Sequence, residues 1–463
     1  MKSNTYIKYL LSLIFGINVM AQENDECPQY LSIFAENAKV KNYKAAYEPW
    51  SLVRRDCPDL NIAIYVYGER ILKDRLKNSP ETEKIDRQND LLKLYDDWVQ
   101  YFPTKKGRND VGNILSAKAQ TMIDFKIGSD QEIYSIFDDA FKKDLESFSN
   151  PKRLYNYFKI LYEIYKSKND NITPEKLFEK YEDVSEKFEF ESVKLAKNLD
   201  RILNKEESGE ALTTRDLKNK RIYDVNSNAI SIYLKNLDAI ISKESSCENL
   251  IPLYERNFDQ NRQNIVWLKR AANRMDSKEC SDDPFFVTLV EALHALEPSA
   301  DSAYYLGLLN DKSGNSKEAL RYYEESISLE TDNYRKAKIL LKIANKFRVA
   351  GRRSSARNYA MKALSYQPSL GRAYLLIANL YADSANDCGD SQFNKRAVYW
   401  LAADLAQKAS RVDNSLSKIA RKAADSYKGR APSKTDIFTE GNEGTVIKFD
   451  CWINRSVTVP KLQ

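Results

Sequence analysis

Apolar residues recur along most of this chain at intervals of three and four positions. Residues 91–101 and 154–165 are clear examples, with Leu, Ile, Tyr, Phe and Trp at i, i+3, i+4 and i+7 between lysines and acidic residues. This period places the apolar side chains on one face of a helix and the charged ones on the other. The pattern predicts a chain built almost entirely from amphipathic helices.

A second pattern, made of small residues, is clearest between Gly351 and Pro368. Ala356, Ala360 and Ala363 follow this glycine at helical spacing. Small side chains let two helices approach closely, and a proline ends the unit. The same pattern occurs about 37 residues earlier in Gly307, Gly314, Ala319, Tyr323 and Ser326, and later in Ala378, Ala402, Ala406 and Ala409.

These three units, over about 299–414, resemble tetratricopeptide repeats. The resemblance implies stacked pairs of antiparallel helices that form a solenoid with a concave binding face. The step from Ala356 to Ala402 is 46 residues, which is longer than the usual period of about 34. We therefore expect an insertion near 383–395.

The repeat pattern weakens outside this region, although helical spacing persists. We predict an N-terminal divergent helical-repeat region at 22–206, central helical hairpins at 207–298 and repeats with the insertion at 299–430. The tail at 431–463 is rich in β-branched and aromatic residues over Thr445–Ile453 and Ser456–Val459, with Asn454-Arg455 as a two-residue turn. The predicted fold is an all-α solenoid of helical hairpins with a short C-terminal β-hairpin tail.

The first 21 residues predict a secretory signal peptide. Lys2 and Lys8 precede an apolar run that is too short to span a membrane, and Val19-Met20-Ala21 resembles a cleavage site. No later segment reaches the length that a membrane helix needs. We expect an exported protein of a Gram-negative bacterium, periplasmic or associated with the outer membrane.

Six cysteines fit this exported location, since disulfides persist in oxidising compartments. Cys27 and Cys57 bracket one predicted hairpin, and Cys247 and Cys280 bracket another. In each pair the first helix begins beside the point where the second ends, so the predicted disulfides are Cys27–Cys57 and Cys247–Cys280. Cys388 and Cys451 remain as the third pair, Cys388–Cys451, and six buried free thiols are the alternative.

The sequence offers little for catalysis. Its one histidine, His294, lies late in a predicted helix, where a structural role is expected. Without a second histidine there is no histidine pair for zinc, and glycine-rich phosphate-binding motifs are absent. We therefore expect no enzyme, metal or cofactor. Two Asp-Ser-Ala triplets resemble a bacterial O-glycosylation signal, and Ser384, near the predicted insertion, is the candidate acceptor.

Charge is distributed unevenly along the chain. Residues 333–382 contain eleven Lys and Arg and no Asp or Glu. An ordinary exposed helix mixes both signs to form pairs at i and i+4, which argues for a binding surface, whereas charge runs are more often solvated, so a binding surface and a solvated cationic face both stay open.

The resemblance assigns part of this charge to the concave wall of the repeats. The predicted groove residues are Lys338, Lys342, Asn345, Arg348, Arg372 and Asn379. Asparagine and basic residues at such positions resemble a clamp for a peptide carboxylate. The first unit departs from that clamp, because its corresponding residues are Asp301, Tyr304, Leu308 and Asp311.

The sequence thus predicts a non-enzymatic interaction scaffold that holds an anionic partner in a basic groove. An acidic protein segment and an anionic glycan both fit, whereas nucleic acid does not suit an exported protein. A glycan-binding accessory protein, with some of the 29 tyrosines as stacking platforms, is one alternative. A hydrolase based on two carboxylates is the other.

Overall fold

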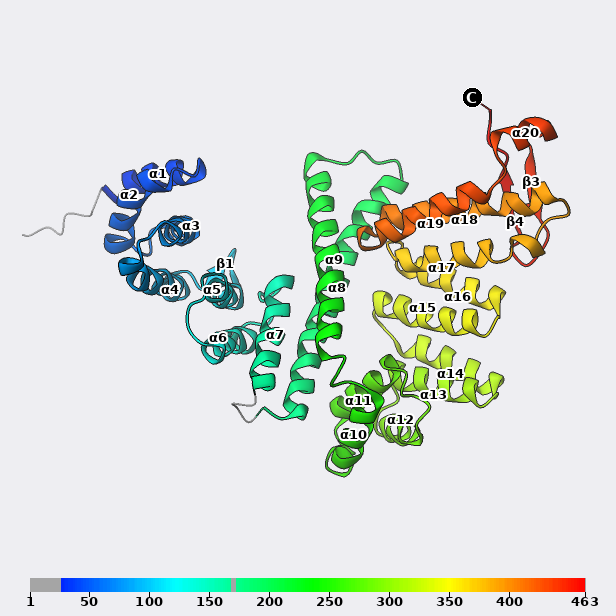
Figure 1. The fold of residues 1–463 in the computed structure, drawn as a ribbon, viewed down its shortest axis with the longest axis horizontal. Helices are drawn as coiled ribbons and strands as arrows, with labels where there is room; N and C mark the ends of the chain where they lie inside the picture. Colours follow the sequence, from blue (N-terminus) through cyan, green and yellow to red (C-terminus); the bar gives the residue numbers. More distant parts are fainter. Residues whose placement is uncertain (1–25, 168–171, 463) are drawn as a thin grey trace, which may run out of the picture. The chain divides into compact units, whose positions relative to one another are not determined.

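The structure is a computed structural model that describes residues 26–167 and 172–462. The predicted signal peptide lies outside the described residues. The chain forms two compact units, the first up to Phe148 and the second from Ser149 onward (Figure 1). No described helix is both long enough and apolar enough to cross a bilayer.

The first unit consists of antiparallel helices and one very short hairpin. Its elements are α1 (Glu26–Lys39), α2 (Tyr43–Asp56), α3 (Ala63–Lys77), η1 (Glu81–Glu83), α4 (Lys84–Tyr101), β1 (Thr104–Lys105), β2 (Arg108–Asn109), α5 (Val111–Phe125) and α6 (Asp130–Lys143). The β1–β2 pair was not predicted. Two residues per strand give no alternation of apolar and polar side chains that a sequence pattern could reveal.

The second unit carries the repeats, a long helical hairpin and the tail. Its elements are α7 (Pro151–Ser167), α8 (Pro174–Glu207), α9 (Thr214–Ile241), α10 (Cys247–Asn261), α11 (Ile265–Ser277), α12 (Pro284–Leu296), α13 (Ala300–Lys312), α14 (Ser316–Leu329), α15 (Asn333–Val349), α16 (Arg353–Tyr366), α17 (Gly371–Ala382), η2 (Ala385–Asp387), α18 (Gln392–Val412), η3 (Asn414–Leu416), α19 (Ser417–Arg430), α20 (Lys434–Glu440), β3 (Val446–Phe449) and β4 (Arg455–Thr458). The predicted boundaries at 206, 298 and 430 stay predictions.

The expected repeat hairpins are confirmed. Helices α13 and α14, α15 and α16, and α17 and α18 form successive antiparallel pairs that stack in Figure 1. Ala356, Ala360 and Ala363 of α16 are fully buried between neighbouring helices. The backbone of Gly307 lies so close to the Tyr323 ring that a side chain at this position would overlap the ring. Small residues therefore set the helix spacing, as the sequence predicted.

The expected insertion lies between α17 and α18. It consists of a loop around η2 and an N-terminal extension of α18, which is 21 residues long where α14 and α16 have 14. The insertion brings Cys388 to the tail.

Helices α8 and α9 form the feature of this unit that the sequence pattern did not reveal. They contain 34 and 28 residues and pair with each other. Helix α9 begins with a capping box. The Thr213 side chain accepts a hydrogen bond from the backbone N–H of Asp216, and the Asp216 carboxylate accepts one from the backbone N–H of Thr213. In Figure 1 this hairpin stands beside the stacked repeats.

Helix α8 contacts the repeats at several points along its length. Its Lys197 pairs with Asp332 at 2.7 Å, and its Asp200 accepts a hydrogen bond of 2.8 Å from the backbone N–H of Ser369. Near its N-terminal end, Arg274 of α11 pairs with Glu182 in the interior. The concave face of the repeats is thus closed on one side by the chain itself.

The three predicted disulfides are all present: Cys27–Cys57, Cys247–Cys280 and Cys388–Cys451. The first two join the start of one helix to the end of the next, in the α1–α2 and α10–α11 hairpins. All six cysteines are paired.

The predicted β-hairpin tail is confirmed, but the predicted turn is wrong. Strand β3 pairs antiparallel with β4 from Val446↔Thr458 to Phe449↔Arg455, so residues 450–454 form the turn. Cys451 and Trp452 therefore leave the strand. They are held outside it because Cys451 is bonded to Cys388 and Trp452 packs on Tyr381, with ring centroids 5.8 Å apart.

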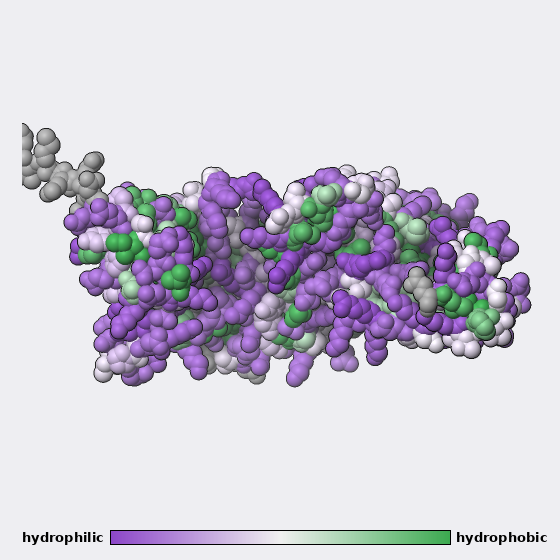
Figure 2. Space-filling view, turned by 90° about the horizontal axis from the view of Figure 1, so that it is seen from above, coloured by the Kyte–Doolittle hydropathy of each residue, from purple (hydrophilic) through white to green (hydrophobic). Residues whose placement is uncertain are grey.

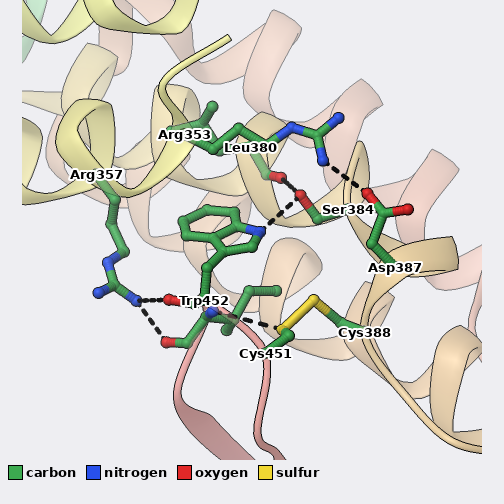
Figure 3. The surroundings of a disulfide bond; sticks show 9 residues. Arg353, Arg357, Leu380, Ser384, Asp387, Cys388, Cys451 and Trp452 are labelled. Carbon is green, nitrogen blue, oxygen red and sulfur yellow. Dashed lines mark hydrogen bonds and ion pairs between the residues drawn. A yellow bond between two sulfur atoms is a disulfide. The ribbon is translucent and has the colours of Figure 1, made fainter.

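The tail is anchored on α16 and α17 around this turn (Figure 3). The Arg357 guanidinium donates to the carbonyl oxygens of Trp452 and Ile453, and the Trp452 indole N–H donates to Ser384 Oγ at 3.1 Å. Phe449 and Ile453 are fully buried. The hairpin, which would be marginal alone, thus caps the end of the solenoid.

Candidate functional site

A hollow in the second unit lies between the repeats and the α8–α9 hairpin. We call it the α15–α17 groove. Its volume is about 890 Å³, which is within the range of pockets that bind ligands. One wall comes from α15 and α17, the facing wall from α8 and α9, and one end from the segment 412–415.

All six groove residues predicted from the sequence line this one cavity. Lys338, Lys342, Asn345 and Arg348 follow one another along α15, while Arg372 and Asn379 lie on α17. They share a wall because positions three or four residues apart lie on one helix face. The structure therefore brings the predicted residues together, and their role in binding stays a prediction.

The two arginines on the α15–α17 wall are free to bind a ligand. Arg348 and Arg372 are exposed, and neither forms an ion pair with another residue in the described parts of the chain. An exposed guanidinium offers five N–H donors in a planar fork that suits a carboxylate.

The two lysines already have partners within the protein. Lys338 pairs with Glu189 of α8 at 2.8 Å, and the Lys342 ammonium lies 5.1 Å from the centre of the Tyr304 ring. Burial opposes ionisation of Glu189, but the nearby charges, Lys338 foremost, outweigh it and hold the pKa of this carboxyl below its ordinary value. The basic wall is therefore partly neutralised by α8.

The two asparagines are oriented by bonds inside the protein. Asn345 Nδ2 donates to the Leu341 carbonyl at 3.1 Å, and Asn379 Oδ1 accepts from the Tyr427 hydroxyl at 2.6 Å. Each amide keeps one end for a ligand: Oδ1 of Asn345 and Nδ2 of Asn379.

The facing wall was missed by sequence reasoning. It presents serine hydroxyls, two carboxylates and one ammonium group, from Ser185, Ser192, Asp224, Ser227, Ser231, Lys235 and Asp238. The available signal was the length of the two helices between Pro174 and Ile241, which exceeds that of a repeat helix. Nothing in the sequence told which face of the repeats they would cover.

Two polar atoms of this cavity lack a protein partner. Gln367 is 8% exposed, and its Oε1 accepts no hydrogen bond in the described structure. Ser185 Oγ also has no hydrogen-bond partner among the described residues. Buried acceptors without partners are costly, and because both atoms have almost no accessible surface, a ligand in the groove could bond to them only if their side chains moved.

Two of the three carboxylates that line the groove accept hydrogen bonds from the protein. Asp238 accepts from the Tyr181 hydroxyl, and Asp413 Oδ1 accepts from the N–H and hydroxyl of Ser415 at 3.0 and 2.6 Å. Burial, reinforced by the charges of Asp413 and Glu206, raises the pKa of Asp224 above its ordinary value. Among the described residues, no cluster of His, Cys, Asp and Glu could hold a metal ion.

Most tyrosines of the repeats pack in the core. Tyr304, Tyr305 and Tyr323 are almost fully buried, and Tyr181 is the only aromatic residue that lines the described groove. The stacking platforms that a sugar ring needs are therefore missing from this part of the structure.

Two other residues singled out in the sequence are structural. His294 shares a hydrogen bond of 3.0 Å with Ser302 and packs edge-on against Tyr322. Ser384 is fully buried, accepts from Trp452 and donates to the Leu380 carbonyl, so a glycan has no access to its hydroxyl in the folded protein.

Comparison with known proteins gives limited matches. No protein-family model matches the chain. The photosystem I assembly proteins Ycf3 of Cuscuta gronovii and Cuscuta obtusiflora are each 32% identical over 110 residues, which is 22% of this chain and 66% of each relative. The chain therefore spans just under two thirds of their length.

Two solved structures align over most of this chain, but with low sequence identity and low TM-scores. Yeast Tom70 is 12% identical, with 90% of this chain and 99% of that chain covered and a TM-score of 0.28. The Cut9–Hcn1 assembly is 9% identical, with coverage of 86% and 96% and a TM-score of 0.30. The match that bears on the repeats predicted from the sequence is the one to Ycf3, which contains tetratricopeptide repeats.

Proposed function

We propose that the protein is a non-enzymatic interaction scaffold of the bacterial envelope, which binds an acidic segment of a partner protein in the α15–α17 groove. The observation that carries this proposal is the convergence of Arg348 and Arg372, both without an ion-pair partner among the described residues, on one cavity with Asn345 and Asn379. Each arginine would hold a carboxylate in a bidentate pair.

The remaining groove chemistry supports a peptide as the ligand. A peptide backbone supplies N–H donors for Oδ1 of Asn345 and carbonyl acceptors for Nδ2 of Asn379.

The alternatives draw less support from the same cavity. An anionic glycan would find one aromatic residue, Tyr181, for stacking. A hydrolase needs two carboxylates free to act on substrate, whereas Asp238 and Asp413 are held by Tyr181 and Ser415.

The envelope location is supported by the cysteines. Three disulfides, at Cys27–Cys57, Cys247–Cys280 and Cys388–Cys451, suit an oxidising compartment. We place the protein in the periplasm or at the outer membrane on this ground and on the signal-like N-terminus.

Reversing the two groove arginines tests the proposal. A short blocked peptide of alternating Glu and Ala is expected to bind the purified protein, and the double variant Arg348→Glu with Arg372→Glu to lose about a hundredfold or more in affinity, since each charge-assisted bond contributes roughly 1.5–3 kcal/mol. Fluorescence anisotropy at several salt concentrations measures both affinity and its salt dependence, which should flatten in the variant.

The matched control is Arg335→Glu with Lys362→Glu, which makes the same change of charge at exposed residues outside the groove. This variant should bind within about threefold of the wild type, since screening weakens distant charges. Equal affinity of the wild type for a Lys–Ala peptide would contradict the proposal. Tighter binding of an oligogalacturonate would favour the glycan reading.

A further inference from the structure

The outer face of α9 exposes apolar side chains that no described element covers. Ile222, Val225 and Ile232 are 44%, 58% and 48% exposed, whereas only Ile230, Leu237 and Ile241 of this helix are buried. Most surface apolar residues occur singly. A group of this size on one helix needs a physical reason.

The exposed residues follow a coiled-coil spacing. Ile222, Val225, Ala229 and Ile232 are separated by three, four and three positions. This places them at successive a and d positions of a heptad, on a single narrow seam. Two of the four are isoleucine and one is valine, the β-branched residues that pack well in such seams.

The seam is separate from the groove. The groove is lined by Asp224, Ser227, Ser231, Lys235 and Asp238 of the same helix. With about 100° between successive residues, these five lie on a different side of α9 from the four seam residues. One face therefore closes the groove and the other faces away from it.

The charges around the seam have one sign. Arg215 and Lys218 extend it toward the N-terminus, and Arg221 and Lys235 flank it at g-type positions, where Lys235 lies at the border between the seam and the groove that it also lines. These four side chains are exposed and form no ion pair with residues 26–167 or 172–462. The acidic residues of the helix, Asp216, Asp224 and Asp238, lie on its other side.

The charge excess decides between two kinds of helical partner. An antiparallel second copy would bring the g-type cations Arg221 and Lys235 toward their own equivalents, and like charges across a seam oppose pairing. A helix with acidic flanking residues would pair with them instead. On the remaining flank, Tyr233 packs on Tyr155 of α7, with ring centroids 5.3 Å apart.

We propose that the seam Ile222–Val225–Ala229–Ile232 of α9 is a second docking surface, which binds an acidic amphipathic helix of a partner protein by coiled-coil packing. This surface acts independently of the α15–α17 groove. The scaffold would then hold two segments, one in the groove and one on the outside of its closing wall.

The test uses a designed helical peptide with Leu and Ile at a and d and Glu at e and g, and a matched peptide with Lys at e and g. The purified protein is expected to bind the acidic peptide and not the basic one. The double variant Val225→Asp with Ile232→Asp should weaken this binding by about tenfold or more, because it removes two apolar contacts and adds like charge. Arg221→Glu should reduce the salt dependence.

Ile419→Asp is the control, since Ile419 of α19 is 55% exposed and lies off the seam. Ile419→Asp should bind like the wild type, and all variants should keep the wild-type melting temperature because the residues are exposed. Equal binding of both peptides, or undiminished binding by the double variant, would overturn the proposal. Dimerisation that the double variant abolishes would also overturn the proposal, because the seam would then bind a second copy of the chain. Binding to anionic vesicles without peptide binding would overturn it too, because the seam would then bind a membrane.

Discussion

Replacing Arg274 with alanine is expected to lower the stability of the second unit by about 3–5 kcal/mol, which is the cost of leaving one member of a buried ion pair alone. Arg274 of α11 and Glu182 of α8 are 4% and 6% exposed and pair with each other, and the guanidinium carbon lies 3.9 Å from the centre of the Tyr181 ring. Differential scanning calorimetry should show the melting transition of this unit about 5–8 °C lower.

Arg270→Ala provides the matched control on the same helix. Arg270 pairs with Asp183 and Glu186 of α8, and these three side chains are 22%, 24% and 56% exposed, so the loss of Arg270 should cost less than the loss of the buried Arg274, about 1 kcal/mol. Equal destabilisation by the two variants would show that burial of the Arg274 pair does not set its strength.

The pH dependence of the Arg274→Ala variant follows from Glu182. Burial raises the pKa of this carboxyl above its ordinary value even with Arg274 present. Without Arg274 the ionised carboxylate is less stable in the folded state, so its folded pKa rises further above the unfolded value of about 4.3. The destabilisation should therefore be full at neutral pH and shrink as the pH falls and Glu182 becomes protonated.

Removing the third disulfide, with Cys388→Ser and Cys451→Ser together, is the other change with a large expected effect. The bond joins cysteines 63 positions apart. Closing a loop of this length contributes about 4 kcal/mol in the chain-entropy model. The tail keeps its contacts through Arg357 and Trp452, so we expect a lower melting temperature with the hairpin still docked at room temperature.

Limited proteolysis reports on the same variant. Fluctuations that release β3 and β4 would expose Phe449 and Ile453, which are buried in the cap, and the tail should be cleaved faster than in the wild type. Unchanged melting and unchanged cleavage would show that the tail is held by its packing alone and that the disulfide adds nothing to the cap.

The parts of the fold that could be predicted are those with local signals. Ala356, Ala360 and Ala363 set a helix spacing that only a close-packed hairpin requires, and the cysteine positions at helix ends follow from antiparallel geometry. The turn at 450–454 could not be predicted in this way, because its conformation depends on Cys388 and Ser384, which lie more than sixty residues away in the sequence.

The candidate site was predictable on one wall only. Lys338 and Arg348 lie on one face of α15 and Arg372 lies on the neighbouring face of α17, and the orientation of both faces follows from the repeat pattern. The facing wall depends on where the α8–α9 hairpin docks, and that is decided by tertiary pairs such as Lys338–Glu189 and the bond from Ser369 to Asp200. No periodicity in the sequence carries this information.

The α15–α17 groove is tested most directly by placing a photo-crosslinking amino acid at Asn345, in the groove, and at Ile419, on the exposed face of α19, in cells that make the protein. The groove position is expected to give a discrete crosslinked partner that Ile419 does not give. This product should disappear when Arg348→Glu and Arg372→Glu are added and persist with Arg335→Glu and Lys362→Glu. A crosslinked product at Asn345 that survives reversal of both groove arginines would contradict the binding of an acidic partner in this groove.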